Sequence, residues 1–559
     1  MTTSTPAPRS LDLSTRRADM FPTLGDAQIA RIAPLGSERT YDAGTTLFDE
    51  GDVDIPFFVV LEGEIEIVHP RGAIEEPVTV HHRGEFTGEV SLLADRRALV
   101  RGRARGPLRV LRLERPQLLR LVRSDAELSE IFMRAFILRR MGLLAGGQGD
   151  AVVVGSQYSA ATLRLQEFLT RNGHPFRYVD VDREPNVQAM LDDFHVALAD
   201  VPVLICRGQR VLKNPTNAEV ADCLGFNAAL EPHAVLDLVI CGAGPGGLAA
   251  AVYAASEGLD VLVIEPSAPG GQAGSSSKIE NYLGFPTGIS GQALSARALS
   301  QAQKFGARLA IAREAMRLHR EAACYRVELS NGESVYAKAI VVATGAEYRR
   351  LDLPERSRFD GVGVYYGATH VEAQRCDGED VIVVGGGNSA GQAATFLARS
   401  SRHVHVLIRG LSLADSMSRY LVQRIEETQN ITLRRRTAIV GLEGGKHLER
   451  VIWANAEGER STHPIRHVFT MTGASPNTRW LDGCLALDEH GFVYAGSDLT
   501  AEQLKAAGWP LPRRPYHFET SQPRVFAVGD VRSGSVKRVA SAVGEGSVCV
   551  QLVHKVLSE

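Results

Sequence analysis

Along the first 150 residues or so, short segments of alternating apolar and polar residues predict a small β-roll. FFVVLEGEIEIV (57–68) and LRVLRL (108–113) are two such segments, and Gly, Pro and Asp break the pattern between them. The spacing then changes. PQLLRLVRSDAELSEIFMRAFILRRM (116–141) carries apolar residues every three to four positions, which predicts helix. We therefore expect residues 1–149 to form a β-roll followed by a helical segment.

Residues 150–230 carry a different pattern, in which apolar strands alternate with helices. The apolar segments are AVVVGS (151–156), FRYVDVD (176–182) and VPVLICRGQRVL (201–212), and the helical patterns are SAATLRLQEFLTRNG (159–173) and PNVQAMLDDF (185–194). The third apolar segment is long enough for two strands, and a last helical pattern follows it. The order predicts a β-α-β-α-β-β-α domain.

A glycine-rich turn follows the apolar segment LDLVICG (236–242). It reads Gly242-Ala243-Gly244-Pro245-Gly246-Gly247 and leads into a helical pattern, after which the strand DVLVIE ends in Glu265. Gly242, Gly244 and Gly247 would let a pyrophosphate approach the helix N-terminus, and the acid would accept hydrogen bonds from a ribose. Strand, turn, helix and acid together predict a dinucleotide-binding site.

The same order recurs further along the chain. DVIVVGG (380–386) runs into Gly385-Gly386-Gly387-Asn388-Ser389-Ala390 and a helical pattern, and the next strand, HVHVLIR, ends in Arg409 instead of an acid. A guanidinium attracts a 2′-phosphate and a carboxylate repels it, so this unit should prefer NADPH to NADH. Arg419 is a second candidate for the phosphate. The alternative is that Arg409 only ends a strand edge.

Composition and charge narrow the class of protein. The chain has 559 residues, 44% hydrophobic and 23% charged, and a net charge of -3, so no basic field points to nucleic acid or a membrane. No apolar run reaches about 18 residues, and the N-terminal segment lacks the apolar core of a signal peptide. The cysteines lie too far apart for a Cys-x-x-Cys pair or a paired zinc site. We expect a cytoplasmic protein with reduced thiols and no bound metal.

The first block resembles the cyclic-nucleotide-binding domain across nearly its whole length. The resemblance rests on YDAGTTLFDEGD (41–52), FFVVLEGEIEIV (57–68) and GEFTGEVSLLADRRALVRGRAR (84–105). In that family a turn and an arginine bind the cyclic phosphate through N–H groups and a guanidinium. The matching residues here are Gly88, Glu89, Ser91 and Arg97. Ala98 replaces the family's Ser or Thr and the loop is short, so two alternatives stay open: the domain binds a cyclic nucleotide, or it only packs or dimerises.

The second block resembles the thioredoxin or glutaredoxin fold. Val201-Pro202 stands where that family has a cis-proline. The family's dithiol opens the first helix, where the helix dipole lowers a thiol pKa. That position here reads Ser156-Gln157-Tyr158-Ser159, and serine cannot form a disulfide. The resemblance therefore implies a scaffold or docking module without its redox pair.

The third block resembles thioredoxin reductase of the low-molecular-weight bacterial type, from about Ala234 to the C-terminus. The resemblance rests on GGQAGSSSKIENYLGFP (270–286), VVATGAEYR (341–349), GASPNT (473–478) and VFAVGDVRSGSVKRVASAVGEG (525–546). It implies one non-covalent FAD in the first unit and NADPH in the second. By it, Gly271, Gln272 and Asn281 lie along the flavin, Gly345 belongs to the cofactor-binding set, Asp530 binds the ribitol chain, and Arg538, Val539 and Ala540 lie near the pyrimidine edge of the ring.

The redox dithiol of that family, Cys-Ala-Thr-Cys, is missing. Its position reads Gly367-Ala368-Thr369-His370, so the middle pair remains and both thiols are gone. Cys376 follows as a single thiol, which we interpret as structural, with a lone reactive thiol as the alternative. Without a dithiol beside the flavin, the relay from flavin to disulfide cannot run. His370 is a candidate proton donor, since the unperturbed pKa of imidazole lies near neutrality.

The motifs thus predict electron transfer from NADPH to FAD, and no motif identifies the acceptor that takes the electrons from FAD. Ferredoxin (flavodoxin)–NADP reductases are related enzymes that lack the dithiol. We therefore expect an NADPH-dependent FAD oxidoreductase with a small-molecule or protein acceptor: a quinone, a flavodoxin or a ferredoxin. The alternatives are a thioredoxin-disulfide reductase that uses a lone or external thiol, and a redox- or cyclic-nucleotide-responsive signalling protein. The insertion 495–521 either forms a surface loop or brings Trp509 or Tyr516 to an acceptor site.

These patterns predict a multidomain α/β chain, which we expect to form a homodimer. It would combine a β-roll, a thioredoxin-like domain and two nested Rossmann-type domains. We name the parts the N-terminal roll (1–149), the middle domain (150–230), the first dinucleotide unit (234–350 and 474–559) and the second dinucleotide unit (351–473).

Overall fold

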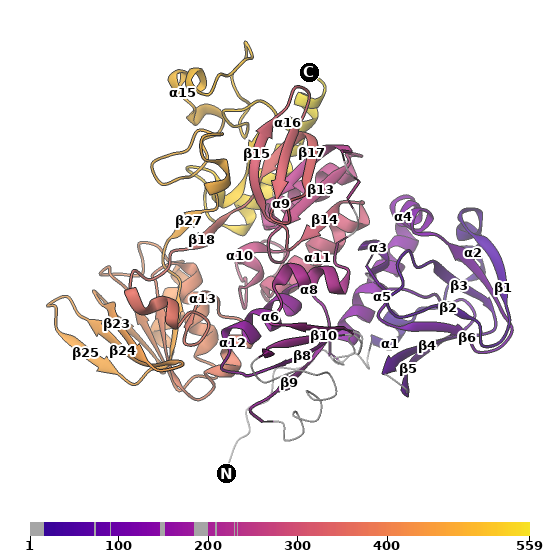
Figure 1. The fold of residues 1–559 in the computed structure, drawn as a ribbon, viewed down its shortest axis with the longest axis horizontal. Coiled ribbons are helices and arrows are strands. Elements are labelled where there is room, and N and C mark those ends of the chain that lie inside the picture. The colour runs from indigo at the N-terminus through magenta and orange to yellow at the C-terminus, as the bar shows by residue number, and fades with distance from the viewer. Residues whose placement is uncertain are drawn as a thin grey trace.

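The computed structural model describes residues 16–71, 74–89, 91–94, 96–145, 151–183, 200–206, 210–227, 230–231 and 233–559. The middle domain lies at the centre of the molecule, between the N-terminal roll and the second dinucleotide unit and below the first dinucleotide unit (Figure 1). The helix expected at 185–194 falls outside the described residues. In the described part of the chain, no helix combines the length and apolar character needed to cross a membrane.

Two antiparallel sheets form the N-terminal roll, with strand orders β1-β7-β3 and β2-β6-β4-β5. Rings of Phe57 and Phe86 contact Phe132 of the long helix, which fixes that helix on the roll. The predicted helical run breaks at Asp125, whose Oδ1 accepts a hydrogen bond of 3.0 Å from the N–H of Leu128. The elements are α1 (Arg17–Met20), α2 (Asp26–Ile32), β1 (Ser37–Tyr41), β2 (Thr46–Phe48), β3 (Phe57–Glu62), β4 (Ile65–Arg71), β5 (Ile74–His81), α3 (Ser91–Ala94), β6 (Arg101–Ala104), β7 (Leu108–Leu113), α4 (Arg115–Ser124) and α5 (Ala126–Ala145).

The middle domain is a four-stranded sheet in the order β11-β10-β8-β9, with β8 parallel to β9 and antiparallel to β10. The Val201–Pro202 bond is cis, as expected. Ser159 caps the first helix, because its Oγ accepts a hydrogen bond of 3.3 Å from the N–H of Thr162. The elements are β8 (Ala151–Gly155), α6 (Ala160–Arg171), β9 (Phe176–Asp180), β10 (Val203–Cys206), β11 (Arg210–Lys213) and α8 (Asn217–Leu224).

A seven-stranded sheet is the centre of the first dinucleotide unit. Its order is β14-β13-β12-β17-β16-β15, with β28 paired to β17. Strands β12, β13, β14, β17 and β28 run parallel, and the predicted strand–turn–helix–strand order is confirmed. The elements are β12 (Val235–Cys241), α9 (Pro245–Ser256), β13 (Val261–Glu265), α10 (Gly271–Gly274), α11 (Gly291–Lys304), β14 (Arg308–Ile311), β15 (Ala315–Arg320), β16 (Tyr325–Leu329), β17 (Ser334–Val342), α15 (Ala501–Ala506), β28 (Val525–Ala527) and α16 (Val539–Leu557).

The second dinucleotide unit repeats the plan with a five-stranded parallel sheet in the order β19-β26-β20-β21-β22. A three-stranded antiparallel sheet, β23-β24-β25, is added to it, and the pair β18 (Ala346–Tyr348) and β27 (Ala474–Pro476) connects the two units. The elements are β19 (Val364–Tyr365), α12 (His370–Arg375), β20 (Asp380–Val384), α13 (Asn388–Leu397), β21 (His403–Leu407), α14 (Arg419–Glu427), β22 (Ile431–Arg434), β23 (Ala438–Gly444), β24 (Leu448–Ala454), β25 (Arg460–His463) and β26 (His467–Thr470).

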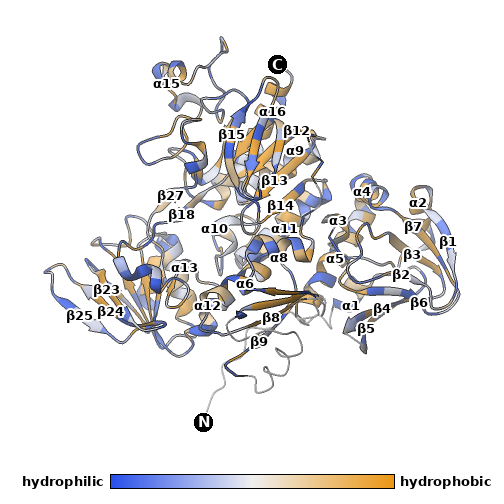
Figure 2. Ribbon diagram, viewed as in Figure 1, coloured by the Kyte–Doolittle hydropathy of each residue, from blue (hydrophilic) through white to orange (hydrophobic). Residues whose placement is uncertain are grey.

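Apolar strands carry the core of both dinucleotide units. β13 is hydrophobic along its length and β12 is hydrophobic apart from Asp237, whereas the outer strand β25 is hydrophilic (Figure 2). Buried strand residues on one face of the first unit's sheet pack against α9 and α16. Strands that are covered on both faces need this continuous apolar pattern. The parallel sheets therefore hold the two glycine-rich turns rigidly at the ends of β12 and β20.

Candidate functional site

Backbone contacts shape the first glycine-rich turn. Gly242 has φ = +107°, and a Cβ there would lie 2.3 Å from the carbonyl oxygen of Ala343. A Cβ at Gly247 would lie 1.9 Å from the carbonyl oxygen of Gly242. Gly244, in contrast, has no atom within 4 Å of its Cβ position, and Pro245 follows it as the first residue of α9. The turn thus leaves open space at the N-terminus of a 12-residue helix, which fits a pyrophosphate.

Glu265 ends β13 beside this turn. Its buried carboxylate accepts hydrogen bonds from the N–H groups of Ala243 at 2.9 Å, Ser267 at 2.9 Å and Ala268 at 3.1 Å. Burial raises its pKa, and the backbone donors act in the opposite direction. Oε1 takes two of the three bonds and Oε2 takes one. A lone pair on Oε2 therefore remains to accept from a ribose hydroxyl.

The second glycine-rich turn has the same construction. Gly385 has φ = +139°, and a Cβ there would lie 2.3 Å from the carbonyl oxygen of Met471. The Cβ position of Gly387 has no atom within 4 Å, and this residue precedes α13. Asn388 is already engaged, because its Oδ1 accepts a hydrogen bond of 2.7 Å from the N–H of Ser418. This turn also fits a pyrophosphate, with Asn388 holding the loop that follows the next strand.

Two arginines lie exposed beyond this turn. Arg409 comes two residues after β21, and Arg419 is the first residue of α14. Within the described residues, neither guanidinium has a carboxylate at ion-pair distance. Both are therefore available to a phosphate on the second dinucleotide.

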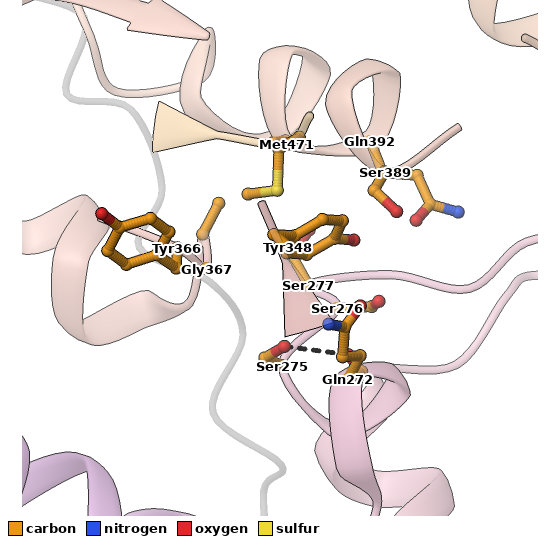
Figure 3. A pocket seen from close by; sticks show the side chains of 12 residues that line it. Gln272, Ser275, Ser276, Ser277, Tyr348, Tyr366, Gly367, Ser389, Gln392 and Met471 are labelled. Carbon is orange, nitrogen blue, oxygen red and sulfur yellow. Dashed lines mark hydrogen bonds between the residues drawn. The ribbon is translucent and has the colours of Figure 1, made fainter. Parts of the chain in front are cut away.

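The two dinucleotide units meet at a small pocket, which we call the junction pocket. Figure 3 shows Ser389 and Gln392 of α13 on one side and Gln272 on the other, with Tyr348 between them. Gln272 and Ser275 belong to the segment 270–277, which we call the flavin loop. Residues predicted for FAD and residues predicted for NADPH thus converge on one point, as hydride transfer requires.

Hydrogen bonds and close packing fix the flavin loop. Gln272 donates from Nε2 to the carbonyl oxygen of Ala346 at 2.5 Å. A Cβ on Gly271, which has φ = +53°, would lie 3.1 Å from Cα of Gly244. The flavin loop therefore packs directly on the first glycine-rich turn.

The remaining residues predicted for FAD lie at loop and helix ends. Asn281, Arg538 and Ala540 are exposed, and Gly345 has φ = +65°. Val539 begins α16. Asp530 is half-buried, and burial raises the pKa of its carboxyl group. None of these positions is filled by core packing, so each remains a predicted cofactor contact.

The position of the family dithiol lies beside the flavin loop. A Cβ on Gly367 would lie 3.7 Å from Cβ of Ser275, and Gly367 lines the junction pocket. The second position, His370, begins α12. Cys376 follows α12 and is fully buried, which raises the pKa of its thiol to about 11. That thiol is therefore protonated at neutral pH and shielded from reagents.

Two other cysteines lie close together, away from the flavin loop. The Sγ atoms of Cys206 and Cys223 are 2.8 Å apart in the core of the middle domain. Neither residue lines the junction pocket or the larger cavity described next. No dithiol is therefore in contact with the flavin loop in the described part of the chain.

A larger cavity of about 530 Å³ opens between three parts of the molecule. Its walls are α6 of the middle domain, the flavin loop, and the segment from β19 to α12. We call it the large cavity. Glu167 and Glu372 both line it. Trp509 and Tyr516 line neither this cavity nor the junction pocket, so the insertion 495–521 contributes no aromatic ring here.

The end of α6 is bound to the first dinucleotide unit. Arg171 donates from Nη2 to the carbonyl oxygen of Gly271 at 2.9 Å, and Asn172 donates from Nδ2 to that of Ser267 at 3.1 Å. The same helix contributes Leu163 to the apolar core of the second unit. The sequence patterns did not predict these contacts. The periodicity of a helix shows which face is apolar, but it does not show which other domain that face packs against.

The turn expected to bind a cyclic phosphate lies against the middle domain. Gly88 has φ = +103°, the carboxylate of Glu89 lies 3.6 Å from the guanidinium of Arg140, and Ser91 begins α3. The side chain of Arg97 packs on Gly225, whose Cβ would lie 2.5 Å from Nε of Arg97. The structure thus places Glu89 and Arg97 on the side of the roll that faces the middle domain.

Two further arginines connect this side of the roll to the middle domain. Arg140 donates from Nε and Nη2 to the carbonyl oxygen of Gly173 at 3.0 and 2.6 Å. Arg96 lies over the ring of Phe226 at 4.9 Å, and burial lowers its pKa to about 10. The arginines near the predicted phosphate turn therefore hold the loop that follows α6.

Comparison with known proteins places these features in a family. Residues 236–546 match the pyridine nucleotide-disulphide oxidoreductases, and residues 38–125 match the cyclic nucleotide-binding domain. A thioredoxin reductase of Listeria innocua is 31% identical over 333 residues, which cover 58% of this chain and 95% of the relative. One of Bacillus subtilis is 28% identical over 337 residues, which cover 58% of this chain and 96% of the relative.

A solved structure of similar fold is the Lactococcus lactis thioredoxin reductase in the FR conformation. It is 26% identical, has a TM-score of 0.52, and covers 58% of this chain and 99% of its own. The family match spans more than half of the present chain, and both glycine-rich turns fit the cofactors. The chain belongs to the pyridine nucleotide-disulphide oxidoreductase family, as a thioredoxin reductase-like, FAD-dependent NADPH oxidoreductase that also carries a cyclic nucleotide-binding domain.

Proposed function

We propose that the chain passes electrons from NADPH through FAD to an acceptor other than a dithiol of its own, namely a quinone, a flavodoxin or a ferredoxin. FAD held at the first glycine-rich turn and the flavin loop would supply the hydride and electron-transfer chemistry between NADPH and the acceptor. The observation that carries the proposal is Gly367, which stands beside Ser275 of the flavin loop where the family has a thiol. A sulfur must lie against the flavin to exchange electrons with it, and a glycine offers none.

The state of Cys376 supports the same conclusion. A lone-thiol reductase needs an accessible thiolate, and burial both encloses this thiol and raises its pKa to about 11. Its Sγ donates to the carbonyl oxygen of Ala373 at 3.5 Å. Cys376 is thus held as a packed residue of the second unit's core.

An acceptor panel tests the proposal. The holoprotein is reduced anaerobically with NADPH and then mixed in turn with a benzoquinone, flavodoxin, ferredoxin, oxidised thioredoxin and an aromatic disulfide. We expect steady turnover with at least one of the first three and none with the last two. Rapid reduction of thioredoxin or the aromatic disulfide, with no reduction of the other three, would reject the proposal.

A second proposal concerns the N-terminal roll, which we infer to regulate the flavin site when it binds a cyclic nucleotide. The supporting observation is a short chain of contacts. Arg140 binds the carbonyl oxygen of Gly173, next to Asn172, which binds the carbonyl oxygen of Ser267 near the flavin loop. An anion that attracts Arg97 or Arg140 would compete with these contacts, so binding in the roll changes how α6 is held.

Calorimetry and kinetics test this regulation together. We expect cAMP or cGMP to bind the full chain and to change the rate of NADPH oxidation. Arg97→Ala should abolish both effects, and the exposed Arg39→Ala on β1 should abolish neither. If cyclic nucleotide binds without changing the rate of NADPH oxidation, the proposed coupling is wrong. If it does not bind, the proposed regulation is also wrong and the roll is a packing domain.

A further inference from the structure

Two carboxyl groups lie where α6 of the middle domain meets α12 of the second dinucleotide unit. Glu167 is half-buried and Glu372 is only 2% exposed, both line the large cavity, and burial and the Glu372 carboxyl group raise the pKa of Glu167. Two carboxylates in such a site repel each other, so one of the pair keeps a proton. We call these two side chains the carboxyl pair.

The neighbours of the pair show which member holds that proton. Thr369 donates from its N–H to Oε2 of Glu372 at 2.7 Å and also donates from its hydroxyl group to the same oxygen. Of the two, the Glu167 carboxyl group is the one whose pKa burial and its partner raise, so the proton is assigned to Glu167.

Charged groups on the adjoining elements oppose this arrangement without reversing it. Burial and the contact with Glu372 raise the pKa of Glu167 to about 9, while Arg171 of α6 and Arg375 of α12 act in the opposite direction. Tyr365 of β19 also lines the large cavity, and burial raises the pKa of its phenol to about 12, so it carries no charge at neutral pH. Glu167 therefore keeps its proton at neutral pH.

The large cavity brings this proton to the redox centre. Its wall includes the carboxyl pair and Gly271, Gln272 and Ser275 of the flavin loop. The volume of about 530 Å³ includes the space beside Gly271 and Gln272 where the flavin is predicted to lie, so the acceptor would occupy the part of the cavity next to the carboxyl pair. Tyr348 and Tyr366 add aromatic surface.

We propose that the large cavity binds a small two-electron acceptor of the quinone class, and that Glu167 donates a proton to it. This inference rests on the proposed function and names its acceptor. The quinone takes up a hydride from the reduced cofactor and a proton from the Glu167 carboxyl group, and its two carbonyl oxygens become hydroxyl groups. The Glu167 carboxylate that remains regains a proton from solvent, so charge and atoms balance.

The position of α6 argues for a small acceptor over a protein. This helix forms one wall of the cavity and is held at its end by Arg171 and Asn172, so it covers the flavin loop on this side. Flavodoxin and ferredoxin receive electrons through their own cofactors and use neither a small-molecule cavity nor a held proton. A quinone uses both.

Ferricyanide supplies the internal reference for a test, because it accepts single electrons and no proton. We expect Glu167→Gln in the holoprotein to lower the quinone-to-ferricyanide rate ratio at least tenfold, since general acid catalysis contributes roughly 10²–10⁴-fold. Glu489→Gln, at a side chain that is 86% exposed, is the matched control and should keep the ratio. An unchanged ratio in Glu167→Gln would overturn the proposal.

Two further readouts do not depend on turnover through Glu167. The infrared band of a protonated carboxyl group should be present in the wild-type holoprotein and absent in Glu167→Gln. Thr170→Trp, which narrows the cavity from α6, should raise KM for the quinone and leave KM for NADPH unchanged. If the band persists in Glu167→Gln, the proton is not on Glu167. If Thr170→Trp leaves the KM for the quinone unchanged, the quinone does not bind in the large cavity.

The same panel separates this inference from the proposed function. If the wild type reduces ferricyanide and flavodoxin but no quinone, only the inference fails. If the wild type reduces oxidised thioredoxin and no quinone, flavodoxin or ferredoxin, the proposed function fails as well.

Discussion

Arg171, at the end of α6, donates a hydrogen bond of 2.9 Å to the carbonyl oxygen of Gly271 in the flavin loop. The two residues belong to different domains, so the middle domain forms part of the surroundings of the FAD site. Gly271 in turn packs on Gly244 of the first glycine-rich turn. This contact connects the middle domain to the flavin loop.

Arg171→Ala should therefore weaken FAD binding. Loss of a hydrogen bond from a charged donor costs about 1.5–3 kcal/mol, which corresponds to a roughly ten- to hundredfold rise in the Kd for FAD. Fluorescence titration of the deflavinated protein with FAD measures it. Arg177→Ala, at an exposed position of the same domain, is the control. Equal Kd values for Arg171→Ala and wild type would show that the contact does not hold the flavin loop.

We expect Arg409 to set the preference for NADPH. It is exposed beyond β21, and its guanidinium has no ion-pair partner among the described residues. Removal of its contact with a 2′-phosphate costs about 1.5–3 kcal/mol. Arg409→Ala should weaken NADPH roughly ten- to hundredfold and leave NADH nearly unchanged, as measured by KM for both. Equal losses of affinity for NADPH and NADH would show that Arg409 does not contact the 2′-phosphate, and Arg419→Ala would be tested next.

The raised pKa of Glu167 predicts a pH dependence of stability. An unfolded glutamate titrates near 4.5 and the folded one near 9, so the folded state holds the extra proton between these values. The stability from this group is complete below about pH 4.5 and is lost as pH rises through about 9. Glu167→Gln removes the titrating group, so its melting temperature minus that of the wild type should rise between about pH 5 and 9. If this difference in melting temperature stays constant over that range, Glu167 does not hold the proton.

Local patterns in the sequence predicted much of the fold. The turns at Gly242 and Gly385 were predictable because strand, glycine and helix follow one another directly in the chain. The break at Asp125 was missed, since apolar spacing continues through it and only the cap onto Leu128 ends the helix. The resemblance to thioredoxin implies only that Ser156-Gln157-Tyr158-Ser159 cannot form the redox pair, whereas in the structure Ser159 caps α6.

The candidate site also contains residues that motifs predict and residues that only domain packing brings together. The residues expected at FAD and NADPH come from motifs, and the structure brings Gln272 and Ser389 to one pocket. Glu167 lies in an ordinary helical pattern, and Glu372 lies two residues after His370, the last residue at the position of the family dithiol. Their pairing depends on how two domains meet, and periodicity within each domain carries no information about that. The same is true of Arg140 and Gly173.

We propose that electrons leave the flavin without passing through a dithiol of this chain. The most direct measurement counts titratable thiols in denaturant before and after anaerobic reduction of the holoprotein with NADPH. We predict that the flavin is reduced and that the count stays the same in the wild type and in Cys376→Ser. A gain of two thiols on reduction, abolished by Cys376→Ser or by Cys206→Ser, would contradict the account and restore a disulfide reductase.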